Sequence, residues 1–120
     1  MIRFRPGEWS AQVEAWLAPA FVQCGQLSEA RDVSRLAIAE DETGPVGAVL
    51  VSFFDGWVFI EAVGGEPAAG LARSAMEWAK DLAREVKAKG VAARTAKPAM
   101  VLHLVRAGAR LDAAYLSMEV

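Results

Sequence analysis

Residues 46–63 read VGAVLVSFFDGWVFIEAV, and this stretch decides the fold class. It is rich in β-branched and aromatic residues on both sides of Asp55-Gly56, a pair that favours the tight turn of a β-hairpin. Upstream, Leu36 and Ile38 alternate with small residues, and the turn residues DETGP follow at 41–45. We therefore expect three strands that form an antiparallel meander.

A long helix follows the meander. Its apolar residues recur at helical spacing and form one continuous stripe, made of Leu71, Ala75, Trp78, Leu82 and Val86. We expect this helix to begin near Pro67 and to end at Gly90, which suits a helix C-cap. Residues 91–95 then predict a short strand that runs parallel to the last strand of the meander, because a helix connects the two.

Three further elements complete the expected order. The spacing of Trp9, Val13 and Trp16 predicts a helix that begins near residue 7 or 8 and stops before Pro19. A short helix is expected over residues 98–108, and a last strand over 111–120; residues 21–35 stay ambiguous. The prediction is one α/β (α+β) domain over residues 1–120, with a mixed, mainly antiparallel sheet flanked by helices.

Composition narrows the class of protein. The chain has 120 residues, 54% of them hydrophobic, and a formal net charge of -2, which argues against disorder and against a strongly basic nucleic-acid binder. No apolar run reaches the roughly 20 residues of a membrane span, so we expect a cytoplasmic domain. The single cysteine, Cys24, and the single histidine, His103, provide no zinc cluster. No metal site is expected.

The element order from Leu36 to Val120 resembles the core of the GNAT N-acetyltransferases. In that family, a Gln/Arg-x-x-Gly-x-Gly/Ala turn at the start of the long helix holds the pyrophosphate of acetyl-CoA. Residues 67–72 read PAAGLA, so Gly70 and Ala72 match the Gly-x-Ala part. The resemblance implies a GNAT-like domain in which the amides of Ala69, Gly70, Leu71 and Ala72 would hold acetyl-CoA, because free amides at a helix N-terminus bind anions.

The sequence also departs from the family pattern. Pro67 stands where the family has Gln or Arg, and Glu66 beside it would repel a phosphate. The family's catalytic tyrosine position is Leu104, and its Asn position is Lys97. His103 is the neighbour of the tyrosine position and is a candidate for proton transfer near neutral pH; the alternative is an ordinary polar residue.

Glu61 is the candidate general base. It lies on the strand that enters the loop, and its carboxylate would accept the proton of an amine, directly or through water, if it faces a cleft. The alternative is a solvent-facing residue of an alternating strand. Tyr115 is expected to serve packing or an interface, and Cys24 is expected to be a small core residue and not a nucleophile.

Two functions from different classes stay open. The first is a degenerate GNAT-like domain that has lost acetyl transfer and acts as a structural or binding component. The chain is also similar to small GNAT-like proteins encoded among the virion genes of tailed bacteriophages, which implies host cytoplasm or virion as its place and other protein subunits as partners, in a homo-oligomer or a virion assembly. The alternative is an acetyl-CoA-dependent N-acetyltransferase that acts on an amine.

Two structural features would separate these functions. A water-filled split between the strands near Glu61 and Val91 would favour the enzyme. An exposed cluster of Trp9, Trp57 and Tyr115 would favour an assembly protein, because exposed aromatic side chains are typical of interfaces.

Overall fold

The computed structural model describes residues 1–21, 34–66, 70–93, 105, 106 and 108. Its strands are β1 (Arg3–Pro6), β2 (Arg35–Asp41), β3 (Gly44–Phe54), β4 (Trp57–Gly65) and β5 (Gly90–Ala93), and its helices are α1 (Ala11–Leu17), the 3-10 turn η1 (Ala18–Phe21) and α3 (Leu71–Glu85). The strands lie side by side in chain order; β1 to β4 are antiparallel, and β5 runs parallel to β4. The predicted meander, the long helix and the mixed, mainly antiparallel sheet are confirmed.

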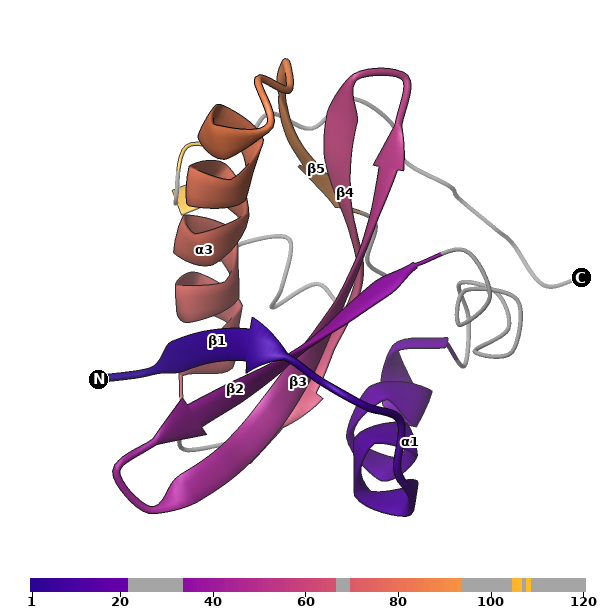
Figure 1. Cartoon of the computed structure of the whole chain (residues 1–120), viewed down its shortest axis with the longest axis vertical. Helices are drawn as coiled ribbons and strands as arrows, with labels where there is room; N and C mark the ends of the chain where they lie inside the picture. The colour runs from indigo at the N-terminus through magenta and orange to yellow at the C-terminus, as the bar shows by residue number, and fades with distance from the viewer. Residues whose placement is uncertain (22–33, 67–69, 94–104, 107, 109–120) are drawn as a thin grey trace, which may run out of the picture.

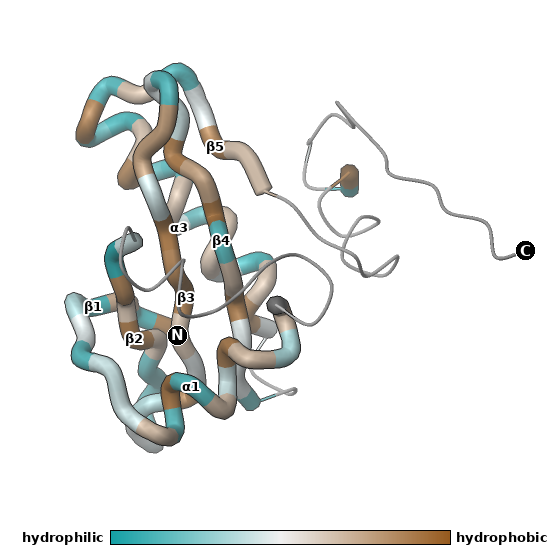
Figure 2. Tube along the Cα trace, turned by 90° about the vertical axis from the view of Figure 1, so that its right-hand side faces the viewer, coloured by the Kyte–Doolittle hydropathy of each residue, from teal (hydrophilic) through white to brown (hydrophobic). Residues whose placement is uncertain are grey.

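Helices cover the two faces of this sheet. α3 lies on one face and α1 on the other (Figure 1). Val49 and Val51 of β3 pack under α3, while Leu50 between them packs under α1, and all three are essentially inaccessible to solvent. A strand that is buried on both faces must be apolar at every position, which explains the hydrophobic runs along β3 and β4 (Figure 2).

β1 is an element that the sequence did not predict. The expected order began with a helix, but Arg3–Pro6 forms a short edge strand that pairs with β2. Four residues are too few for a periodic signal. Phe4 anchors the strand by stacking on Trp78 of α3, with 5.2 Å between the ring centroids.

The first helix begins later than expected. Ser10 is its N-cap, and the Ser10 hydroxyl accepts a hydrogen bond from the amide of Val13 at 3.2 Å. Because this cap fixes the helix start at Ala11, Trp9 lies outside the helix. Trp9 and Trp16 both pack against the α1 side of the core, so Trp9 is not part of an exposed aromatic cluster. Tyr115 and Cys24 lie outside the described residues.

The long helix also ends earlier than expected. Its cap is Val86, and the next residue, Lys87, adopts the left-handed conformation with a φ of 59°. Lys87 thus takes the place that we had assigned to Gly90, which instead begins β5. Of the expected helix at 98–108, the structure describes Val105 and Arg106 as helical and Gly108 as a turn. The expected strand at 111–120 lies outside the described residues.

Glycines allow α1 to lie directly on the end of β4. A Cβ atom added at Gly64 would overlap the carbonyl oxygen of Trp16, and one at Gly65 would overlap the backbone of β3 and the side chain of Leu71. The Gly64-Gly65 pair therefore serves close packing of backbone on backbone.

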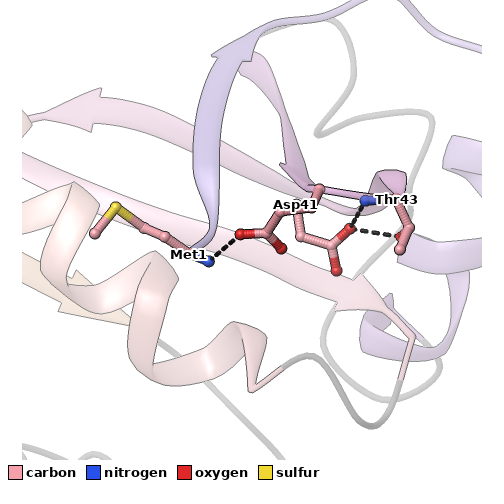
Figure 3. A network of polar contacts seen from close by, with 4 residues as sticks. Met1, Asp41 and Thr43 are labelled. Atoms are coloured by element: carbon pink, nitrogen blue, oxygen red, sulfur yellow. Dashed lines mark hydrogen bonds and ion pairs between the residues drawn. The ribbon is translucent and has the colours of Figure 1, made fainter.

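A polar network fixes the turn between β2 and β3 (Figure 3). The Asp41 carboxylate accepts hydrogen bonds from the Thr43 hydroxyl at 2.6 Å and from the Thr43 amide at 2.8 Å. These two bonds hold the pKa of Asp41 below its ordinary value. The ammonium group of Met1 pairs with Glu42 at 2.8 Å, and this contact lowers the pKa of Glu42.

Candidate functional site

Strand β4 contains a bulge at Glu61. Leu50 of β3 pairs with Ala62, whereas the next residue, Val51, pairs with Ile60, so Glu61 is an extra residue without a partner position on β3. The bulge shifts the alternation of the strand: Ile60 packs under α3, and Ala62, two residues later, packs under α1. Bulges re-aim side chains and are frequent beside active sites.

The bulge places the Glu61 carboxylate on the face of the sheet that α1 covers in part. There the Ser52 hydroxyl donates a hydrogen bond to Glu61 Oε1 at 2.8 Å, and both side chains are half-buried. This bond fixes the orientation of the carboxylate through one of its two oxygens. Sequence reasoning found Glu61 but missed Ser52, although a serine that interrupts the apolar run at 46–54 was a usable signal.

Strand β5 lies parallel to β4 next to this bulge. The described pairs run from Trp57 with Gly90 to Ile60 with Ala93, where the described part of β5 ends, and β4 itself continues to Gly65. Val91, where a split between the strands was considered, pairs with Val58.

The N-terminus of α3 follows β4 in the chain, separated from its end by residues 66–70. Gly70 is the N-cap of the helix and adopts the left-handed conformation, with a φ of 65°. Glycine has no side chain that could cap the helix amides. The first turn holds no acidic residue, and Arg73 there is exposed. This helix start favours an anion. It offers the backbone amides of Leu71, Ala72 and Arg73, the positive end of the helix dipole and one guanidinium, so the described residues fit a pyrophosphate.

The individual site residues have different outcomes. Gly70 is the N-cap of α3 and Leu71 and Ala72 begin it, so the described helix starts later than the start expected near Pro67. The Leu71 side chain is buried against Ala39 and Val46, which leaves its backbone as the part that could contact a ligand. The binding role of these three residues stays a prediction. Ala69 and Pro67, like His103, lie outside the described residues.

Two findings concern other kinds of site. Among the described residues, no group of three or more His, Cys, Asp or Glu side chains lies close enough to hold a metal ion. No helix in the described ranges is long and apolar enough to cross a membrane.

No protein-family model matches the sequence, and no curated protein is similar to it in sequence. Solved structures do match. A transcriptional regulator from Bacillus halodurans C-125 superimposes with a TM-score of 0.71 at 17% identity, over 100% of both chains. A Bacillus subtilis acetyltransferase in complex with CoA gives 0.72 at 13% identity, over 89% of this chain and 74% of the other.

An acetyltransferase from Trypanosoma brucei gives a TM-score of 0.63 at 16% identity, again over 100% of both chains. Identities this low establish the fold and nothing finer. This chain has the α+β fold of the GNAT acetyltransferases.

Proposed function

We infer that the chain binds acetyl-CoA and transfers its acetyl group to an amine. The observation that carries this inference is the bulge on the strand that leads to the N-terminus of α3, where the Glu61 carboxylate accepts the hydrogen bond of Ser52. The Bacillus subtilis structure with the same fold contains CoA, which supports the choice of cofactor.

The chain offers acetyl-CoA a site at the start of α3. The pyrophosphate fits the amides there, with Arg73 as a counter-charge. Glu61 lies four strand steps before Gly65, the end of β4, which is about 13 Å at the usual rise of a strand. The bound acetyl-CoA would supply the acetyl thioester.

Glu61 then serves as the general base. Its carboxylate accepts a proton from the ammonium form of the substrate, so that the amine lone pair becomes available. Ser52 fixes the orientation of the carboxylate by its 2.8 Å hydrogen bond. His103 stays the candidate donor of a proton to the departing thiolate; this role rests on its sequence position alone.

Calorimetric titration with acetyl-CoA tests the cofactor site. Arg73→Glu removes the exposed positive charge from the first turn of α3, yet a glutamate there favours the helix dipole, so the fold should be kept. We expect the variant to bind at least about fivefold more weakly, which corresponds to about 1 kcal/mol. Lys89→Glu changes the net charge equally at the far end of the helix and is the control. Equal affinities in the two variants would contradict this site.

A rate measurement tests the base. Glu61→Gln keeps an oxygen that accepts the Ser52 hydrogen bond but cannot take a proton. We expect acetyl transfer to fall by about 10²–10⁴-fold, with acetyl-CoA affinity unchanged. A variant that keeps its rate would show that Glu61 is not the base.

A second candidate function rests on the sequence of the loop. Pro67 has no amide proton, and Glu66 is exposed beside it, which would weaken an anion site. A domain that keeps the fold without its chemistry would act as a structural component that binds other protein subunits, in the virion if it is phage-encoded. Absence of acetyl-CoA binding in the wild-type titration would favour this function.

A further inference from the structure

Three aromatic side chains are exposed at the end of the β3–β4 hairpin. Phe54 is 74% exposed, Phe53 42% and Trp57 36%. They flank the Asp55-Gly56 turn, and Phe54 pairs with Trp57 in the register of the two strands. Proteins in solution rarely gather several large apolar side chains at one exposed spot, so this aromatic tip indicates a contact surface.

The aromatic tip is convex. Phe53 lies on the same face of the sheet as Val51 of the α3 core, whereas Phe54, the next residue, points to the opposite face. The Trp57 ring lies against the backbone of Gly90, since a Cβ atom there would come within 2.8 Å of Cζ3. Figure 1 shows the turn at one end of the longest axis of the molecule, beside the connection from α3 to β5. The rings therefore surround a protruding end and do not line a groove.

Three cations surround the aromatic tip. The Arg35 guanidinium lies over the Phe53 ring, 5.2 Å from its centroid. The backbone amide of Lys89 donates a hydrogen bond to the Gly56 carbonyl at 2.7 Å, and the carbons of the Lys89 side chain lie beside Gly56. Lys87, two residues earlier on the same connection, is exposed. Both lysines can therefore extend their ammonium groups past the turn.

The charge balance at the aromatic tip favours an anionic partner. Asp55 in the turn and Glu85 at the end of α3 oppose the three cations, which leaves the cations in excess. In the rest of the described chain, acidic residues outnumber basic ones. An anionic surface therefore attracts this end of the molecule and repels the remainder, so charge and apolar surface select the same end.

We propose that the aromatic tip binds the surface of a lipid bilayer that contains anionic lipids. Aromatic side chains settle at the level of the lipid headgroups, and Lys and Arg side chains are attracted to anionic headgroups beside them. A fluid bilayer closes around a convex tip that carries rings on both faces, whereas a protein partner would need a pocket that encloses it. The Asp55 carboxylate stays hydrated among the headgroups, so the insertion is shallow.

A second copy of the chain does not fit this surface. An aromatic side chain covers about 150–250 Å², so the exposed fractions of the three rings amount to roughly 300 Å². A stable interface needs about 800 Å² from each partner. In a symmetric pair, Arg35, Lys87 and Lys89 would also approach their own copies, and like charges repel.

Cosedimentation with lipid vesicles tests this proposal. We expect the protein to bind vesicles of phosphatidylcholine mixed with phosphatidylserine at least about fivefold more tightly than vesicles of phosphatidylcholine alone. Phe54→Ser, which alters a mostly exposed ring, should weaken binding by about tenfold or more. Lys89→Glu should weaken binding by at least about fivefold. Asp55→Asn keeps the turn, because Asn-Gly favours it equally, and should strengthen binding by about fivefold. Lys80→Glu, in the middle of α3, is the charge-matched control and should have a much smaller effect.

Tryptophan fluorescence locates the contact. Trp9, Trp16 and Trp78 pack against the core clusters, so a shift of the emission to shorter wavelength on vesicle binding should come from Trp57. The shift should disappear in Trp57→Phe, while the variant still sediments with the vesicles. Equal binding of wild type and Phe54→Ser would overturn the proposal. Absence of binding to either kind of vesicle would also overturn it, and the aromatic tip would then be a surface for a protein partner.

Discussion

The buried hydroxyl of Ser34, the residue before β2, leads to an unusual expectation about stability. In most buried positions, loss of a hydroxyl destabilises a protein. Here Ser34→Ala removes a buried donor that has no hydrogen-bond partner in the described ranges of the chain, so the folded state should no longer bear the free-energy cost of burying an unpaired group. An unpaired buried hydroxyl costs about 1–3 kcal/mol, whereas a methyl group in its place costs almost nothing. We expect the free energy of unfolding to rise by about 1–2 kcal/mol.

Ser52→Ala is the matched control, because it is the same substitution on the same face of the sheet. Ser52 donates a 2.8 Å hydrogen bond to a carboxylate, and its loss should lower the free energy of unfolding by about 1–2 kcal/mol. Urea denaturation followed by the fluorescence of the four tryptophans measures both variants. In thermal unfolding, a change of 1 kcal/mol corresponds to about 4 °C in a domain of this size.

The opposite signs of the two variants make the test sharp. If Ser34→Ala is destabilised as much as Ser52→Ala, the Ser34 hydroxyl has a partner in the free protein. The reasoning that treats this hydroxyl as an unpaired group would then be refuted.

Three further predictions concern the backbone and the turn. Gly64→Ala should lower the free energy of unfolding by about 3 kcal/mol, because its Cβ would overlap the Trp16 carbonyl. In Gly70→Ala only the positive φ is strained, and the loss should be about 1 kcal/mol. Equal losses of stability in urea titrations of the two variants would contradict this. Lys87→Gly should raise Tm, since glycine relieves about 0.5–1 kcal/mol of strain at a φ of 59°; an unchanged Tm would argue against strain there. The hydrogen bonds from Thr43 hold the folded-state pKa of Asp41 below its ordinary 3.8, so Asp41 contributes stability above pH 3.8 and loses it as the pH falls through the lowered pKa. Asp41→Asn should therefore differ from wild type in Tm at neutral pH and approach it below pH 3.8, and a gap that does not depend on pH would contradict the assignment.

Local pattern was sufficient to predict the central part of the fold. Asp55-Gly56 forms the β3–β4 turn, where Asp55 has a φ of 51° and Gly56 one of 82°, as a tight turn of this kind requires. The stripe from Leu71 to Leu82 packs on the sheet as expected. These elements are long and periodic, so tertiary contacts agree with local preference. β1 escaped prediction because its position depends on the distant Trp78 and on β2.

The candidate site was less accessible to sequence reasoning. Glu61 was singled out as a carboxylate on a strand that enters the loop, but its position in a bulge depends on the pairing of β3 with β4. The register of β2 with β3 places Ser34 opposite Ser52, one step beyond the pair of Arg35 with Val51. A one-residue slip would have moved the Ser34 side chain to the other face of the sheet. A sequence shows which residues interrupt an apolar run; only the register shows which of these lie together.

The hydroxyl at position 34 has a cost in stability. Val49, Leu50 and Val51 pack tightly on both faces of the sheet, so an apolar residue at position 34 would be more stable. The chain instead keeps a buried hydroxyl there, and it has no hydrogen-bond partner among the described residues. Ser52 differs, because its hydroxyl is paired with the Glu61 carboxylate. Polar groups that reduce stability in an otherwise well-packed sheet are typical of functional sites. On this argument the free protein is less stable than its sequence would allow, and removal of the Ser34 hydroxyl should stabilise it.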